Sequence, residues 1–392
     1  MSIATITAID EIPAARWNAL ELRGNPTVSH EFLAALEREH CVGAASGWSA
    51  CHLIARDERG ALIGAVPLYR KSHSWGEFVF DWSWAQAYAQ AGLRYYPKLV
   101  SMTPFTPAPA PRLLIAPHAD PTHARRVLID GLLDLAEAER VSTLHVLFVE
   151  DADREALRER GFLLRKDCQF HWYNRGYTSF DAFLREFRAE KRKKALRERR
   201  RIAEAGITFR TLAGEQMDAE LWDIVFAFSS ETFAMRGHEH YLNAAFFRTL
   251  CAAKPSCVMV KLAELQGRPI AAAIFFVGAG TLYGRYWGAA ADFHSLHFET
   301  CYYQGIEYCI ERGLARFEPG TQGEHKVPRG FEPTPTWSAH WIADPRFRRA
   351  IQSYLREERM AVDRYIEEVQ AHVPFRRDGA ASCARDQSRD RT

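Results

Sequence analysis

The sequence predicts an α/β protein with two related domains, each built on a mixed central sheet that helices flank. The chain has 392 residues, more than a single compact core usually holds. Two segments, 51–71 and 257–278, share one pattern: an apolar run, a polar turn that ends at Gly60 or Gly267, and a second apolar run. This pattern is typical of a β-hairpin. A helix and a short strand follow each hairpin, so the order helix, hairpin, helix, strand occurs twice.

The first domain carries extra residues between its hairpin and its next helix. They fall at about 72–112, a stretch with nine aromatic residues and five prolines. Insertions longer than an ordinary loop are usually functional or disordered, and this one is too aromatic for disorder. We therefore expect an ordered lobe that either forms a wall of the acceptor pocket or packs between the domains.

A helix with two different parts joins the domains. Phe180, Phe183, Leu184 and Phe187 form an apolar stripe at helical spacing. Residues 188–201 then hold nine Lys or Arg against two Glu. Gly206 ends the helix, and a strand follows. The predicted regions are an N-terminal domain at 1–177, a basic connecting helix at 178–206, a second domain at 207–372 and a disordered tail at 373–392.

The basic helix is a candidate surface for a polyanion, whose binding would weaken steeply with salt. The alternative is a solvated face, since Glu190, Lys194 and Glu198 stand at the spacing of helical ion pairs. The cations outnumber the acids strongly, which favours a phosphate-bearing ligand. The candidate polyanion-binding residues are Lys191, Arg192, Lys193, Lys194, Arg197, Arg200 and Arg201.

Several classes of protein are disfavoured. No apolar run reaches the roughly 18 residues that span a bilayer, and the start lacks a signal-peptide core, so we expect a cytoplasmic protein. Eight scattered cysteines without a CxxC pair indicate reduced thiols, and no His–acid pair matches HExxH, so we expect no metal. The sequence has no P-loop, GxGxxG turn or GxSxG elbow, which disfavours an NTPase, a dehydrogenase and a serine hydrolase.

Polar and aromatic residues are densest at 283–331. On a predicted strand, Arg285 and Tyr286 face opposite sides. His297 and Glu299 open a helix whose amide end can hold an anion, and the alternative is that they only cap that helix. The segment "GTQGEHKVPRGF" follows a short strand, in the position where a loop at a strand end lines a crevice.

The motifs "HSWGEFVFDW", "YYPKL", "PFTP", "LYGRYWG", "LHFETCYYQGIE" and "QGEHKVPRGF" resemble those of the FemAB-like branch of predicted N-acyltransferases. The twofold order of elements likewise resembles a tandem GNAT-type fold, and "RGF" at 329–331 resembles the Lys-Gly-Phe of Fem-type enzymes. The long helical hairpin of some Fem enzymes is missing, as is the pyrophosphate loop of coenzyme A-binding GNAT enzymes. The resemblance implies α/β tandem GNAT-like domains and the transfer of an activated acyl group, from tRNA or coenzyme A, to an amine.

Such a transfer needs a deprotonated amine, a stabilised oxyanion and a protonated leaving group. We expect Glu324 or His325 as the base, with Glu299 and His297 as second choices, and Tyr283 or Tyr286 as the acid. Lys326, Arg329 and Arg285 are the candidates for holding an anionic group of a substrate. In the first domain, acceptor recognition is expected from Lys71, His73, Glu77 and Asp81, with Trp82 and Trp84 as an apolar wall.

Three classes of function remain open. The first is an aminoacyl-tRNA-dependent transferase, and the second is an acyl-CoA transferase. Both imply an amine-bearing small molecule or peptide as acceptor and no tightly bound cofactor, and the Fem-type resemblance points to peptidoglycan. The third is a non-catalytic RNA- or polyanion-binding protein that kept the fold and lost the chemistry.

Overall fold

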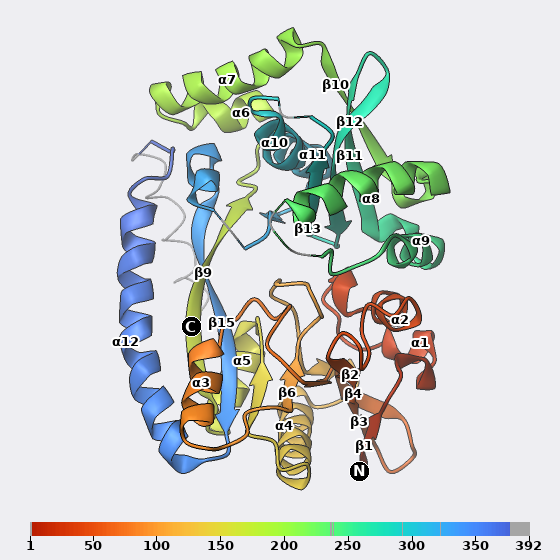
Figure 1. Cartoon of the computed structure of the whole chain (residues 1–392), viewed down its shortest axis with the longest axis vertical. Coiled ribbons are helices and arrows are strands. Elements are labelled where there is room, and N and C mark those ends of the chain that lie inside the picture. The colour runs from red at the N-terminus through yellow and green to blue at the C-terminus, as the bar shows by residue number, and fades with distance from the viewer. Residues whose placement is uncertain (1, 236, 238, 292, 322, 377–392) are drawn as a thin grey trace.

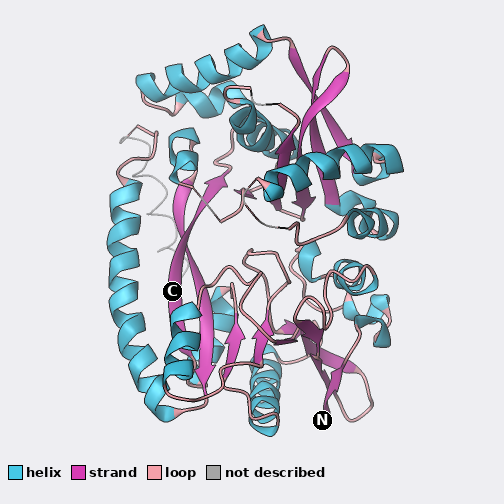
Figure 2. Ribbon diagram, in the orientation of Figure 1, coloured by secondary structure: helices cyan, strands magenta, loops and turns pink. Residues whose placement is uncertain are grey.

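The computed structural model describes residues 2–235, 237, 239–291, 293–321 and 323–376. The strands form two sheets, and helices cover both (Figures 1 and 2). The smaller sheet lies in the first half and is antiparallel throughout, in the order β1-β3-β4-β7. Its strands are β1 (Ser2–Ile6), β3 (His52–Arg56), β4 (Leu62–Val66) and β7 (Leu114–Ile115).

The larger sheet has eleven strands and runs through both halves, in the order β10-β11-β12-β13-β14-β9-β15-β8-β6-β5-β2. The first-half strands are β2 (Trp48–Ala50), β5 (Tyr69–Lys71), β6 (Lys98–Ser101), β8 (Thr143–Val146) and β9 (Leu163–Tyr173). The others are β10 (Ile207–Ala213), β11 (Val258–Leu265), β12 (Arg268–Val277), β13 (Thr281–Ala289), β14 (Arg316–Glu318) and β15 (Glu332–Ile342).

Both predicted hairpins are confirmed. Strands β3 and β4 pair antiparallel across a turn at Gly60, as β11 and β12 do across Gly267. Each of these glycines has a positive φ, 78° and 74°, which an L side chain adopts only at a cost. The turn residue therefore fixes the register of each hairpin.

Two long strands, β9 and β15, join the halves. They pair antiparallel from Glu332 with His171 to His340 with Leu163. β9 then pairs with β14 of the second half, whereas β15 pairs with β8 of the first half. Strand β15 lies within the segment that the sequence assigns to the second domain, yet it completes the sheet of the first. The two halves therefore share one sheet, with β9 and β15 extending across both (Figure 1).

The helices of the first half are α1 (Ala14–Trp17), α2 (His30–Arg38), α3 (Trp82–Gln90), α4 (Pro121–Ala138) and α5 (Asp151–Glu159). Those that follow are α6 (Phe180–Arg185), α7 (Ala189–Glu204), α8 (Ala219–Ala234), α9 (Ala244–Ala253), α10 (Leu296–Phe298), α11 (Gln304–Arg312) and α12 (Pro345–Gln370). A π-helical turn, η5 (Glu299–Tyr303), joins α10 to α11, and η6 (Glu324–Arg329) is a 3₁₀ helix. None of the helices in the described part of the chain is long and apolar enough to cross a membrane.

The connecting segment differs from the single helix that the sequence predicts. It forms two helices, α6 and α7, and the break between them places Phe187 against Phe375. The apolar stripe is confirmed, because Phe180, Phe183, Leu184 and Phe187 are all buried. Phe375 belongs to the predicted disordered tail, so the first residues of that tail are packed, and 377–392 lie outside the described residues.

The aromatic insertion at about 72–112 contributes α3 and β6 to the fold. Phe78 and Phe105 contact Tyr241 of the second half, with ring centroids 5.8 and 5.3 Å apart, so part of the insertion packs between the halves. Pro109 and Pro111 line the cavities described below. The insertion thus packs between the halves at some residues and lines cavities at others, and its role in an acceptor pocket stays a prediction.

Candidate functional site

The sheet opens where β13 and β14 separate. These strands pair in parallel from Thr281 with Arg316 to Tyr283 with Glu318, and there β14 ends while β13 continues to Ala289. The pairing of β13 with β12 also shifts at this point and skips Arg285, which makes Arg285 the extra residue of a β-bulge. A bulge frees the backbone groups of one residue from the ladder and is common beside active sites.

Polar and charged residues gather around this opening from five parts of the fold: the start of α5, the strands β9, β13 and β14, and the helix η6. We call them the central charged cluster: Glu150, His171, Tyr283, Arg285, Arg316, Glu318 and Lys326. The sequence singled out Tyr283, Arg285 and Lys326. It did not identify the other four, because only the pairing of distant strands brings them together.

Lys326 is buried, with 2% of its surface exposed, and its ammonium donates a hydrogen bond to the carbonyl of Gly320 at 2.6 Å. Burial, and then the positive charge of Arg285, lower the pKa of Lys326 to about 7. A lysine with this pKa is present in both its charged and its neutral form near neutral pH. Such a group can give or take a proton at that pH.

His171, also buried, lies on β9. Burial, followed by the charges of Arg316, Lys326 and Arg285, lowers its pKa well below the ordinary value, so the imidazole is neutral. Its Nε2 lies 3.1 Å from Oε1 of Gln169, and the amide nitrogen of Gln169 donates to Pro107. Because a carbonyl oxygen only accepts, Nε2 carries the proton and Nδ1 holds a lone pair. That Nδ1 has no partner among the described residues.

Arg285 and Glu318 also have unused polar atoms. The Nε and Nη2 atoms of Arg285 are closed off from solvent and have no hydrogen-bond acceptor in the described part of the chain. Glu318 is buried and paired with Arg316 at 3.0 Å, and burial raises its pKa. Buried donors without acceptors are costly, so the unused Arg285 donors suit an oxygen of a ligand or a water.

A cavity of about 310 Å³ adjoins the cluster between the two halves. Its lining combines the segment that leads into α5, part of β15 and residues of β9 and β14: Arg23, Pro109, Val149, Glu150, Asp151, His171, Arg316, Thr334, Pro335, Thr336 and Trp337. Arg23 forms an ion pair with Glu150 at 2.7 Å. The lining of the cavity thus includes cationic, acidic and neutral polar groups.

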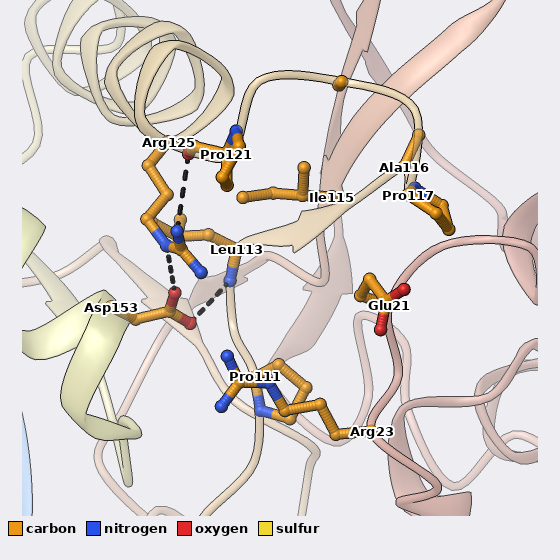
Figure 3. A pocket seen from close by; sticks show the side chains of 11 residues that line it. Glu21, Arg23, Pro111, Leu113, Ile115, Ala116, Pro117, Pro121, Arg125 and Asp153 are labelled. Atoms are coloured by element: carbon orange, nitrogen blue, oxygen red, sulfur yellow. Dashed lines mark hydrogen bonds and ion pairs between the residues drawn. The ribbon is translucent and has the colours of Figure 1, made fainter. Parts of the chain in front are cut away.

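Arg23 also lines a second cavity, of about 290 Å³ (Figure 3). Leu113 and Ile115 belong to its lining, and at one side of it Nε of Arg125 donates a hydrogen bond to Asp153 at 3.1 Å. Asp153 accepts hydrogen bonds from the backbone of Arg112 and Leu113 as well, so its carboxylate is fully engaged in the fold. The lining of this second cavity thus combines apolar side chains with the charged groups of Glu21, Arg23 and Arg125.

The η6 residues other than Lys326 make contacts within the fold. Exposed Glu324 accepts a hydrogen bond from Tyr365 at 2.8 Å, and Nε2 of His325 lies 2.8 Å from the hydroxyl of Tyr302. Partial burial and the charges of Lys326 and Arg329 lower the pKa of His325 to about 4. Neither residue belongs to the central charged cluster.

Arg329 makes contacts within the fold. It is buried, pairs with Glu198 of α7 at 2.8 Å, and its guanidinium carbon lies 3.3 Å from the ring centroid of Phe298. A guanidinium that is stacked and ion-paired in this way holds η6 against α7. Its Nε has no partner among the described residues, and its contact with a substrate stays a prediction.

Three further candidates lie outside the cluster. Tyr286 points away from Arg285 into the core, 4.5 Å from the ring of His240, and burial raises its pKa. Glu299 is bound by Arg199 and Gln304. The ring of His297 packs 5.3 Å from that of Trp287. These contacts are packing and ion pairing within the fold, whereas the alternative expected from the sequence is that His297 and Glu299 cap the helix.

The first-domain candidates form a buried network around a residue that the sequence analysis missed, Lys98. Its ammonium donates to Ser74 and Glu77, both at 2.8 Å, and to Asp81. Burial raises the pKa of Glu77 to about 7; that of Asp81 is lowered to about 2 because the charges of Lys98 and His145 outweigh its burial. This network lines neither cavity, so it supports the fold of the insertion and is not an open recognition surface.

Lys71 and His73 lie beside this network. Burial lowers the pKa of Lys71 to about 7, and its ammonium sits 3.8 Å from the ring centroid of Trp48. Of the predicted apolar wall, Trp84 is buried against His340, whereas Trp82 is partly exposed and contacts Trp75. Neither tryptophan lines a described cavity.

The basic residues of α7 lie at the outer edge of the second half (Figure 1). Lys191 and Arg192 are half-buried, and Lys193, Lys194, Arg197, Arg200 and Arg201 are exposed. The ion pairs expected from Glu190 and Glu198 to Lys194 do not form, because Glu198 faces inward to Arg329. Among the described residues, no group of three His, Cys, Asp or Glu is arranged to hold a metal ion.

Comparison with known proteins places this geometry in context. The FemAB-like family model, described as peptidoglycan biosynthesis/recognition, matches residues 8–377. Similar solved structures include FemX (TM-score 0.54, 13% identity, 90% of this chain and 100% of that one). The C-terminal domain of a putative lysylphosphatidylglycerol synthetase from Agrobacterium fabrum is also similar (TM-score 0.54, 11% identity, 87% of this chain and 95% of that one). So is L-PGS from Bacillus licheniformis (TM-score 0.51, 10% identity, 87% of this chain and 97% of that one). No curated protein matches the sequence.

Proposed function

The chain belongs to the FemAB-like family and has the tandem GNAT-type fold of FemX, and from this premise we propose that it is an N-acyltransferase. The proposed reaction forms an amide from an activated acyl donor and an amine acceptor. The observation that carries this proposal is the central charged cluster at the opening between β13 and β14. It combines donors without acceptors, a neutral imidazole and a lysine whose pKa is about 7.

In the proposed reaction, the amine nitrogen attacks the acyl carbonyl and forms the new C–N bond. The negative charge that develops on the carbonyl oxygen is stabilised by the unpartnered donors of Arg285 and by the backbone freed at its bulge. As the C–O or C–S bond to the donor breaks, the leaving atom takes a proton from Lys326. Nδ1 of His171 accepts a hydrogen bond from the attacking amine, and the proton that the amine loses passes to the neutral form of Lys326, which then supplies it to the leaving atom.

These assignments differ from those that the sequence favoured. His325 is engaged by Tyr302 and Glu324 by Tyr365, whereas Nδ1 of His171 faces no described partner. Burial raises the pKa of Tyr283, so it keeps its proton at neutral pH. Tyr283 serves in the proposal as a hydrogen-bond donor in the cluster, and Lys326 as the acid.

The donor is proposed to be an aminoacyl-tRNA or an acyl-CoA, and the acceptor an amine on a peptide of a peptidoglycan precursor. The family description supports the acceptor class. Native mass spectrometry of the freshly purified protein would reveal bound tRNA, acyl-CoA or a peptide-like metabolite. Transfer assays with radiolabelled aminoacyl-tRNA and acetyl-CoA, each with a peptidoglycan precursor as acceptor, separate the two donors.

The test of the site compares substitutions inside the cluster with one outside it. Arg285→Gln removes oxyanion donors and is expected to lower the rate of transfer about a hundredfold or more. His325→Gln removes an imidazole of η6 outside the cluster and is expected to keep the rate within a few-fold. If His325→Gln lowers the rate and Arg285→Gln does not, with both variants folded, the active site lies at η6 and not at the cluster.

A further inference from the structure

Helix α7 has one face built into the fold and one face left to solvent. On the inner face, Glu198 accepts hydrogen bonds from Arg329 at 2.8 Å and from the hydroxyl of Tyr303 at 2.6 Å. Arg199 binds Glu299 and Glu307. These charged contacts and the buried Ile202 fix the position of the helix. The outer face is therefore presented as a preformed surface.

The outer face is strongly basic. It carries five exposed cations: Lys193, Lys194, Arg197, Arg200 and Arg201. Within the described residues, Arg200 lies 3.6 Å from Glu204, whereas Lys193, Lys194 and Arg197 have no carboxylate within ion-pair distance. The surface thus holds an excess of positive charge that the fold does not neutralise.

An apolar side chain stands at the edge of this face. Leu196 has 47% of its surface exposed. Helical spacing places Lys193 one turn before it and Arg200 one turn after it on the same side of the helix. An exposed leucine between cations gains nothing from a phosphate backbone in water. At a bilayer surface it can enter the acyl region while the cations meet the lipid phosphates.

We propose that the outer face of α7 binds the surface of an anionic lipid bilayer. The basic residues provide charge complementarity, and Leu196 provides the apolar contact that distinguishes a bilayer from RNA. The helix lies at one end of the molecule, where no other described element covers it (Figure 1). The surface is remote in sequence from the cavity residues, and the inference does not depend on the proposed acyl transfer.

The test is sedimentation of the full chain with vesicles. Vesicles of phosphatidylcholine with 30% phosphatidylglycerol, about a third anionic as in a strongly charged leaflet, are compared with vesicles of phosphatidylcholine alone. The protein is expected to bind only the anionic vesicles, and to leave them as salt is raised. The triple variant Lys193→Gln, Lys194→Gln, Arg197→Gln is expected to lower the partition coefficient about a hundredfold, since each basic residue near an anionic surface contributes about a fivefold factor.

A matched control removes three exposed arginines elsewhere, Arg16→Gln, Arg59→Gln and Arg94→Gln, and is expected to keep most of the binding. Leu196→Ser is expected to weaken binding several-fold while its salt dependence stays the same. Circular dichroism checks that each variant is folded. Equal loss in the control variant, or no effect of Leu196→Ser, would overturn the proposal. So would tight binding of tRNA that the α7 variants abolish, in a protein that does not bind the vesicles.

Discussion

Lys98 illustrates what single buried charges do in this molecule. It has no exposed surface, and it faces two carboxylates, Glu77 and Asp81. Removing one member of a buried ionic network leaves the remaining charges uncompensated. The resulting loss of stability is far larger than the net stability that the intact network contributes. The network therefore fixes the segment between β5 and α3 as long as all of its charges are present.

Lys98→Met is expected to lower the free energy of unfolding by about 3–5 kcal/mol, because it strands Asp81 in the core. Glu77→Gln is expected to cost much less, since Glu77 has a pKa of about 7 and its amide replacement still accepts the hydrogen bond of Lys98. Urea unfolding of both variants at pH 7 measures the difference. Equal costs would show that the network is not organised around Lys98.

Lys326 gives a prediction about pH. Its pKa in the folded protein is about 7, below the value near 10.5 of an unfolded lysine, so the unfolded chain binds more protons between these values. The stability that this group contributes therefore rises as pH increases from 7, and is lost as pH falls through 7. Lys326→Met abolishes the titration.

The free energy of unfolding of Lys326→Met minus that of the wild type should therefore fall between pH 7 and pH 9. Denaturant unfolding at three pH values in this range measures it, with all other titrating groups shared by the two proteins. A difference that stays constant with pH would place the pKa of Lys326 outside this window and remove it as the proposed acid.

At the scale of elements, close approach of α8 to β13 supports the site. A Cβ on Gly288 would lie 2.0 Å from the backbone of Phe228 in α8, so the helix packs directly on the strand that carries Arg285. Backbone cannot move aside as a flexible side chain does. Gly288 therefore sets the distance between the helix and the strand.

Gly288→Ala is expected to destabilise the protein by about 1–3 kcal/mol or more, as an overpacked core does. Gly280→Ala is the matched control, because a Cβ there meets open space, and it is expected to change stability by less than about 0.5 kcal/mol. Thermal unfolding of the two variants measures the contrast. A neutral Gly288→Ala would mean that α8 does not rest on β13.

The elements that the sequence predicts well are those with local signals. The two hairpins follow from their glycine turns, and the apolar stripe of α6 follows from its spacing. The break between α6 and α7 has no such signal, because it depends on the contact of Phe187 with Phe375. The place of β15 in the first-half sheet is also set by pairing with distant strands, which no local pattern specifies.

The residues of the candidate site also divide into those with a local signal in the sequence and those that only the fold brings together. Tyr283, Arg285 and Lys326 stand in a polar segment of the sequence and could be singled out there. His171 lies on β9, far in the sequence from this segment, and it meets Arg316 and the others only because β9 lies beside β14. Lys98 escaped notice for a similar reason, since its partners are 17 and 21 residues away in the chain.

At the scale of the whole molecule, the shared sheet makes each half depend on the other. Strand β15 lies between β8 and β9, so the segment 1–177 alone lacks the strand that joins them. We expect 1–177 expressed by itself to be largely unfolded, and coexpression with 178–392 to restore a folded complex. Amide proton dispersion in NMR spectra measures this. A well-dispersed spectrum of the isolated segment would contradict the dependence.

The central claim is that acyl transfer takes place at the central charged cluster between the halves. The most direct test is the rate of transfer of a radiolabelled acyl group to a peptidoglycan precursor by the wild type, Arg285→Gln and His325→Gln, each checked for folding. The account predicts a fall of about a hundredfold or more for Arg285→Gln and little change for His325→Gln. An active wild type whose rate Arg285→Gln leaves unchanged would contradict it.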